Sequence, residues 1–223
     1  QALRAFGYAA LASLFALLIG FPLAYFIGIT LRRFPLLQAL CLVLVIAPFF
    51  ISFLLRTLAW KQIFAIEGPV AGLASAIGLL GPGESITGTA FSVVFGLTYN
   101  FIPFMVLPIY ATLVSLDLRL LEASNDLYGS PATTFRTVTL PLSAAGVMSG
   151  TLLTFIPAAG DYINASREFL GSTDTTMIGN VIEANFLVLQ NFPAAAALSL
   201  ILMAFILVLV SAYVKRSGTE DLL

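Results

Sequence analysis

Residues 117–141 read DLRLLEASNDLYGSPATTFRTVTLP, and they separate two long stretches of uncharged sequence. The run from Leu118 to Tyr128 carries apolar side chains at helical spacing, and Gly129 can adopt the backbone angles that end a helix. Ser130-Pro131 is typical of a helix cap followed by a first-turn proline. The stretch therefore predicts two short helices, joined by a turn, in an otherwise apolar chain.

The sequence on both sides of this hairpin is apolar enough to cross a membrane. A helix needs about 20 apolar residues to span the hydrocarbon layer. Five stretches reach that length with few or no charges, which predicts an all-α membrane protein with one transmembrane domain over residues 1–223. The expected spans are about 5–31, 35–56, 89–115, 139–160 and 193–214, and the hairpin helices occupy 118–138.

The composition excludes a soluble globule. Of the 223 residues, 60% are hydrophobic and 9% are charged, against roughly 25% charged residues in an ordinary soluble domain. The net charge of −1 provides no basic field for nucleic acid, so nucleic-acid partners are excluded and the lipid bilayer is the expected environment. With no His and only Cys41, the chain lacks the usual ligands of zinc, haem and iron–sulfur centres, and no metal site is expected.

The distribution of Lys and Arg predicts the orientation, because cytoplasmic loops carry the excess. Six basic residues fall on the side of the hairpin and four on the other side. The hairpin is therefore expected in the cytoplasm, whereas residue 1 and the segments 57–88 and 161–192 are expected outside. An external start predicts one further helix before residue 1, and thus six spans in the full-length protein.

Both long external segments contain helical patterns. Residues 68–83 are rich in glycine and apolar side chains and predict a short helix at the membrane interface. Residues 176–190 place apolar side chains on one stripe and Asn180, Glu183 and Asn185 on the other. A partly polar helix at this depth is expected to face protein or water.

Several spans contain residues that bend helices or bring them close together. Membrane helices tolerate proline, but proline also marks the broken helices of transporters. Gly146 and Gly150 form a small-xxx-small pair that would let the fourth span approach a neighbour. The prolines inside the expected spans are Pro22, Pro48, Pro103, Pro108 and Pro157.

The hairpin resembles the E-A-A loop of ABC importer permeases. Glu122-Ala123-Ser124 opens the pattern, and Leu140-Pro141 closes it at the family's distance. Two positions depart from the family pattern, since Ser124 replaces the second Ala and Tyr128 stands where Gly is usual, with Gly129 one place later. In that family the loop docks in a cleft of a separate ATPase subunit. The resemblance implies an ATPase contact formed by Glu122, Ala123, Asp126, Gly129 and Arg136.

The resemblance covers essentially the whole chain and is closest to the spermidine/putrescine permease group. The segments 48–60, 99–110 and 177–182 look like the corresponding parts of polyamine permeases. This similarity implies a MetI-like permease fold in the bacterial inner membrane. It also implies three partners, namely a dimer of ABC ATPase subunits, a second permease chain that is related but different, and an external substrate-binding protein.

The chain has no nucleotide site of its own that a motif would reveal. The phosphate-loop pattern Gly-x-x-x-x-Gly-Lys-Ser/Thr does not occur in the sequence. A catalytic role is therefore not expected, and no cofactor is expected in this chain. ATP and Mg²⁺ would be bound by the partner ATPase.

A passage for a polycation is expected to offer carboxylates and aromatic faces. Arg56, near the outer end of the second span, is a possible ion-pair partner for one of these carboxylates. Glu168 and Asp174 are instead expected to be solvated or to contact the binding protein. The candidates for the substrate path are Asp161, Tyr162, Asn180, Glu183 and Tyr99.

The sequence thus predicts a permease subunit that moves a polyamine by alternating access. One alternative keeps the importer class but changes the substrate to ferric iron, sulfate, molybdate or phosphonate. Another is an uncoupled channel or a membrane scaffold, for which the hairpin 117–141 would have no ATPase to bind. A membrane-embedded enzyme ranks lower still, because no catalytic pair can be named.

Overall fold

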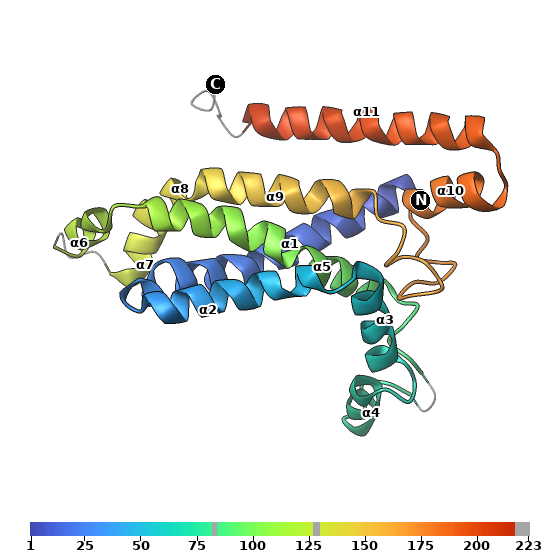
Figure 1. The fold of residues 1–223 in the computed structure, drawn as a ribbon, viewed down its shortest axis with the longest axis horizontal. Helices are drawn as coiled ribbons and strands as arrows, with labels where there is room; N and C mark the ends of the chain where they lie inside the picture. The colour runs from blue at the N-terminus through green and yellow to red at the C-terminus, as the bar shows by residue number, and fades with distance from the viewer. Residues whose placement is uncertain (82–83, 127–129, 217–223) are drawn as a thin grey trace.

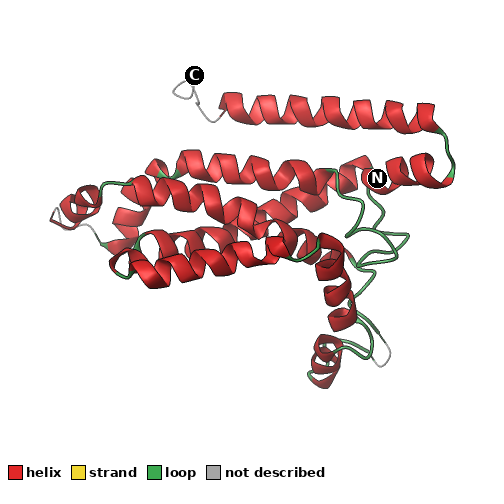
Figure 2. Cartoon of the chain, viewed as in Figure 1, coloured by secondary structure: helices red, strands yellow, loops and turns green. Residues whose placement is uncertain are grey.

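The computed structural model describes residues 1–81, 84–126 and 130–216, and every regular element within them is helical (Figures 1 and 2). Short 3₁₀ segments η1 (Thr30–Arg33) and η2 (Ala47–Phe50) and π-helical segments η3 (Phe135–Thr139) and η4 (Ala184–Val188) extend some of the α-helices. The α-helices are α1 (Ala2–Gly28), α2 (Pro35–Ile46), α3 (Phe53–Phe64), α4 (Pro69–Ala76), α5 (Ala90–Ser115), α6 (Leu118–Asp126), α7 (Pro131–Thr134), α8 (Leu140–Leu142), α9 (Ala144–Ala159), α10 (Ile178–Glu183) and α11 (Phe192–Arg216).

Among the described residues, three helices are long and apolar enough to cross a membrane, and two bent pairs raise that number to five. The long helices are α1 with η1, α5 and α11. One bent pair turns by 94° between Phe50 and Phe53, and the other turns by 64° at Ser143. The fold class expected from the sequence is confirmed, although two of the expected spans correspond to bent helix pairs rather than to single helices.

The second expected span, 35–56, is not one continuous helix. After the 3₁₀ turn that contains Pro48, Ile51 and Ser52 adopt extended backbone angles with ψ near 135°, so the helical hydrogen-bond ladder stops there. Helix α3 then leaves the bundle nearly at a right angle (Figure 1). Arg56 consequently lies on α3 rather than at the end of a straight span.

The fourth expected span, 139–160, is also not one continuous helix. Helix α9 begins at Ala144, because the chain bends at Ser143, whose backbone angles of −91° and 0° are not those of an α-helix. The segment 131–142 before the bend belongs to the hairpin. The apolar pattern continues through the bend, which is why the sequence does not reveal it.

The core of the bundle lies between α1, α5 and α9. One face of α1 carries small, fully buried side chains, the first four of them at intervals of three or four residues and the fifth two turns further on. Small side chains allow neighbouring backbones to approach closely, and packing of this kind is a main source of helix association in lipid. These α1 residues are Ala5, Ala9, Ala12, Ala16 and Ala24.

Gly146 and Gly150 bring α9 directly against α5. A β-carbon at Gly146 would lie 2.5 Å from Oγ1 of Thr112, and one at Gly150 would lie 2.9 Å from the carbonyl oxygen of Met105. Both distances are shorter than a van der Waals contact. The small-xxx-small pair is therefore a contact point of the bundle.

The two ends of the bundle carry different elements (Figure 1). Helices α6 and α7 project at one end, whereas α3, α4, α10 and the connection 160–177 lie at the other end. The segments that the basic-residue distribution assigns to opposite sides of the membrane thus lie at opposite ends of the molecule.

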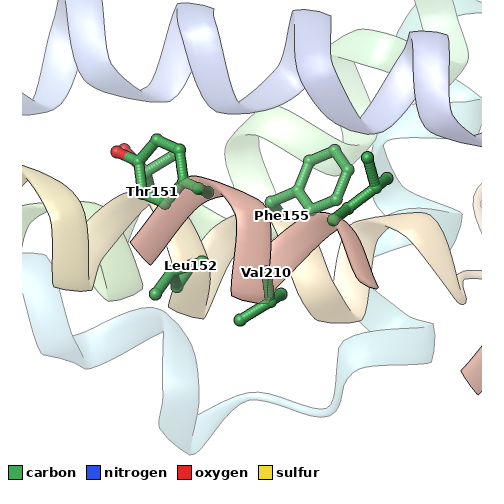
Figure 3. Close-up of a pocket in the computed structure, with 6 residues that line it drawn as sticks. Thr151, Leu152, Phe155 and Val210 are labelled. Atoms are coloured by element: carbon green, nitrogen blue, oxygen red, sulfur yellow. The ribbon is translucent and has the colours of Figure 1, made fainter. Parts of the chain in front are cut away.

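Helix α11 packs only loosely on the rest of the chain, and 6% of the residues in its most apolar stretch are buried. Its aromatic contact to α1 joins Phe205 and Phe6, whose ring centres are 4.7 Å apart. A hollow of about 210 Å³ lies between α9 and α11. Phe155 and Val210 are among the residues that line it (Figure 3). Its lining is almost wholly apolar, so it has the character of a surface that faces lipid or another apolar helix.

Candidate functional site

The hairpin that contains α6 presents its predicted contact residues to the outside of the molecule. Glu122, Ala123 and Asp126 are exposed on α6, and Arg136 is exposed on η3. Gly129 lies outside the described residues. The sequence prediction of a helical hairpin at this place agrees with α6, α7 and η3, and the exposure leaves these side chains accessible to a partner protein.

A hydrogen bond holds the two arms of the hairpin together, and aromatic contacts fasten the hairpin to the bundle. The hydroxyl groups of Ser124 and Thr134 lie 2.8 Å apart and join α6 to α7. Phe135 packs edge-on against Phe21 at 5.5 Å and against Tyr25 at 6.1 Å between ring centres, so η3 is held on α1. A force applied to the hairpin would therefore reach α1 through side-chain contacts as well as α5 through the chain.

The opposite end contains a buried polar group around Asp161. Asp161 is 7% exposed and follows α9. Its Oδ2 accepts a hydrogen bond from the backbone N–H of Asn164 at 2.8 Å, and its Oδ1 accepts one from the side-chain Nδ2 of Asn164 at 3.1 Å. Burial raises the pKa of the Asp161 carboxyl from 3.8 to about 6, although the hydrogen bonds from Asn164 lower it. The group is therefore ionised at neutral pH and titrates just below it.

The hydrogen-bond chain continues from Asn164 into the bundle. Oδ1 of Asn164 accepts from Nδ2 of Asn100 on α5 at 3.2 Å, and the same Nδ2 also donates to Oγ1 of Thr57 on α3 at 3.2 Å. Thr57 in turn donates to the carbonyl oxygen of Phe53 at 3.0 Å. One amide side chain thus links three elements that are far apart in sequence.

Arg56 lies beside this chain of hydrogen bonds but does not pair with a carboxylate in the part of the chain that the structure describes. It is 7% exposed, and its Nε and Nη1 atoms are buried without a hydrogen-bond partner there. Its guanidinium carbon lies 5.6 Å from the ring centre of Phe53. The direct ion pair anticipated for Arg56 is therefore absent in this structure.

Three of the expected path residues lie around one shallow hollow. Tyr162 and Glu183 line a depression of about 330 Å³ together with Gly160, Gly179 and Phe186. Asn180 is buried next to it, where its Nδ2 donates to the carbonyl oxygen of Tyr162 at 2.5 Å and its Oδ1 accepts from the N–H of Met177 at 3.0 Å. Asn180 therefore positions this wall rather than offering its amide to a ligand.

Tyr99 belongs to a different part of the molecule. Its ring lies 5.2 Å from that of Trp60 and 6.4 Å from that of Phe95, within an aromatic group on α3 and α5. The structure thus does not bring the expected path residues into one cavity. It places Tyr99 in the aromatic group, Tyr162 and Glu183 at the hollow, and Asp161 in the buried polar chain.

Three members of this polar chain were not predicted from the sequence, namely Asn100, Asn164 and Thr57. Asn100 was visible as an amide inside a long apolar run, and polar side chains in such runs usually face protein. Its partners were not visible, because Thr57 and Asn164 are separated from it by 43 and 64 residues.

Comparison with known proteins relates the whole chain to one class of transporter. No family model matches the chain. The spermidine/putrescine transport system permease protein PotB of Haemophilus influenzae is 33% identical over 207 residues, which cover 93% of this chain and 71% of that protein. PotB of Escherichia coli is 32% identical and covers 90% of this chain and 71% of the relative. The inner membrane ABC transporter permease protein YdcU of Escherichia coli is 30% identical over 99% of this chain and 72% of its own length.

A solved structure supports the fold. A chain of a bacterial ABC transporter involved in the import of the acidic polysaccharide alginate superposes with a TM-score of 0.66, at 17% identity, over 98% of this chain and 79% of that one. At this identity the match concerns the fold alone, and it agrees with the all-helical bundle. The chain belongs to the ABC importer permeases of the bacterial inner membrane, within the spermidine/putrescine permease group.

Proposed function

We propose that this chain is one of the two membrane-spanning subunits of an ATP-driven importer that carries a polyamine into the cytoplasm. An external binding protein would deliver spermidine or putrescine. A dimer of ABC ATPase subunits, which would bind ATP and Mg²⁺, would supply the energy. The observation that carries the proposal is the exposed hairpin with Glu122 at one end of a membrane bundle whose relatives are polyamine permeases.

The hairpin supports coupling to a partner ATPase. Its acidic side chains Glu122 and Asp126 and the cation Arg136 are all exposed, whereas Phe135 fastens it to the bundle. Closure of the ATPase dimer would displace α6, and the contacts of Phe135 would transmit the movement to α1. The proline-containing helices would then rock, so that a central passage opens to one side and afterwards to the other.

The charges at the opposite end favour a cationic substrate over an anionic one. The side of the membrane that is predicted to be external carries six carboxylates, against the four cations Arg4, Arg56, Lys61 and Arg167. An acidic surface raises the local concentration of a polycation through long-range attraction. The carboxylates are Glu67, Glu84, Asp161, Glu168, Asp174 and Glu183.

Uptake by the complete transporter tests both parts of the proposal. The full-length permease, its partner permease, ATPase and binding protein are reconstituted in vesicles, and uptake of radiolabelled putrescine and spermidine is measured beside ATP hydrolysis. We expect ATP-dependent uptake of at least one polyamine. Glu122→Ala should lower uptake while the ATPase still hydrolyses ATP, whereas Glu67→Ala, the same change on an exposed residue at the other end, should leave the coupling intact.

The alternatives give different results in the same experiment. If neither polyamine is transported but ferric iron, sulfate, molybdate or phosphonate is, the importer class stands and the substrate is wrong. If the permease does not co-purify with an ATPase and conducts without ATP, it is an uncoupled channel. If Glu183→Gln and Asp161→Asn leave polyamine uptake unchanged, neither carboxylate lies on the substrate path.

A further inference from the structure

Two buried side chains near the start of α3 carry polar atoms without partners among the described residues, and the chemistry of these atoms is complementary. Arg56 has unpaired donors at Nε and Nη1, and Asn100 has an unpaired acceptor at Oδ1. Arg56 is adjacent in sequence to the network that holds Asn100, because Thr57, the next residue, accepts a hydrogen bond from Asn100. Burying a guanidinium without a counter-charge costs free energy, so a buried Arg56 requires an anionic partner.

The carboxylate of Asp161 fixes the direction of every amide in this network. An ionised carboxylate only accepts hydrogen bonds, so Asn164 must turn its Nδ2 towards Asp161. The Oδ1 of Asn164 then faces Asn100 and requires a donor, which Nδ2 of Asn100 provides. Consequently the Oδ1 of Asn100 is left as an acceptor without a donor, at the end of the hydrogen-bond chain opposite Asp161. Asn100 lies on α5, and Arg56 lies on α3.

We infer that Arg56 and Asp161 form an ion pair bridged by the side-chain amides of Asn100 and Asn164. In this arrangement each amide has its NH₂ group towards the carboxylate and its carbonyl oxygen towards the guanidinium. Both dipoles are therefore aligned with the field between the two charges, and aligned hydrogen bonds in a medium of low dielectric strengthen one another. The chain closes when Nε or Nη1 of Arg56 donates a hydrogen bond to Oδ1 of Asn100, the donors and the acceptor that are left without partners.

The bridged pair connects three elements at the predicted external end. Arg56 lies on α3, Asn100 lies on α5, and Asp161 and Asn164 lie in the connection after α9. A direct ion pair would hold only two of them. The bridge thus sets the position of α3, which leaves the bundle at a bend of 94° and otherwise packs mainly through its aromatic face. The placement of these elements on the external side of the membrane rests on the proposed function, whereas the bridge itself does not.

Tyr99 is the competing partner for Arg56. Its phenol is near enough to interact electrostatically with the guanidinium. A hydrogen bond from Arg56 to the Tyr99 hydroxyl would neutralise no charge, and it would make Arg56 independent of Asp161. The two possibilities are therefore separated by asking which residue is energetically coupled to Arg56.

A double-mutant cycle in the assembled transporter measures that coupling. The complete permease, bound to its partner permease and ATPase in nanodiscs, is prepared as Arg56→Gln, Asp161→Asn and the double variant. Each single change leaves one buried charge uncompensated, whereas the double variant leaves none. We expect the thermal midpoint of the double variant to lie roughly 2–4 °C above the value that adding the two single shifts gives.

The same cycle in an Asn100→Leu background tests the bridge itself. The difference should fall to near zero there, because the amide that joins the two charges is gone. Arg56→Met is carried in parallel, since its unbranched apolar side chain can still pack on Phe53 if Arg56→Gln fails to assemble. Tyr99→Phe, combined with Arg56→Gln, serves as the control cycle and should show additive shifts.

Three results would overturn the inference. Additive effects of Arg56 and Asp161 in the native background would show that the charges are not paired. Coupling that persists in Asn100→Leu would show that the bridge is not the route. Coupling of Arg56 to Tyr99 instead of Asp161 would show that Tyr99 is the partner of Arg56. Because the measurement is thermal stability, these results do not depend on whether the transported substrate is a polyamine.

Discussion

Asn100 donates a hydrogen bond of 3.2 Å to Asn164, which in turn donates to the carboxylate of Asp161 from both its backbone N–H and its side-chain amide. This contact fastens the connection 160–177 to the middle helix of the bundle. Close approach at this point is possible because Gly96 has no side chain. A β-carbon there would lie 2.5 Å from Oδ1 of Asn164.

Asn164→Ala should therefore release this connection without dismantling the bundle. The change leaves the Asp161 carboxylate and the amide of Asn100 each with one partner fewer, at a cost of about 1–3 kcal/mol. Arg167 is exposed in the same connection, so trypsin added to vesicles with this face outside should cleave there faster than in the unmodified protein. Asn185→Ala is the matched control, because the Nδ2 of Asn185 donates only within its own helix, to Val181 at 2.8 Å.

An unchanged cleavage rate at Arg167 in Asn164→Ala would show that other contacts hold the connection. The carbonyl oxygen of Glu168, which accepts from Nζ of Lys61 at 2.7 Å, is the first such contact to examine. The variant Lys61→Met would then be compared.

Gly150→Val should destabilise the bundle by about 1–3 kcal/mol, because overpacking a close helix contact forces the helices apart. The added β-carbon meets the backbone of Met105 at 2.9 Å, and backbone cannot move aside as a flexible side chain can. The free energy of unfolding in mixed detergent and SDS micelles reports the loss. Gly7→Val on α1 has nothing within 4 Å of its β-carbon and should change the free energy of unfolding far less. Equal losses for the two variants would refute the contact between α9 and α5.

The sequence revealed the elements well but not their interruptions. The hairpin around Glu122 and the span that ends at Ser115 were predictable, because caps, apolar length and charge all depend on neighbouring residues. Pro48 indicated a bend in the second span, but the complete stop of the helix after Phe50 was not predictable, since the residues on both sides of Pro48 are equally apolar. Contacts between distant residues, such as the one that joins Asn100 to Asn164, leave no local pattern in a single sequence.

Phe135→Ala should weaken the mechanical link between the hairpin and α1. The aromatic contacts of Phe135 with Phe21 and Tyr25 are worth about 0.5–1.5 kcal/mol each beyond their burial, so we expect a roughly twofold to tenfold lower ratio of substrate transported to ATP hydrolysed. Uptake and ATP hydrolysis measured in the same vesicles give this ratio. Thr137→Ala, on the exposed side of the same segment, should leave the ratio unchanged, and a drop in both variants would indicate general damage to the hairpin.

The raised pKa of Asp161 makes a definite prediction for the dependence of stability on pH. Because the carboxyl has a pKa of about 6 in the folded protein and an ordinary value of 3.8, the folded state favours the protonated form. This contribution to stability is fully present below pH 3.8 and is lost as the pH rises through about 6. A shift of this size corresponds to about 3 kcal/mol. Unfolding free energies in detergent between pH 4 and pH 7 should therefore contain a decline that Asp161→Asn removes. Asp174→Asn, which neutralises an exposed carboxylate of the same connection, should retain it. A decline of equal size in Asp161→Asn would assign the titration to another group.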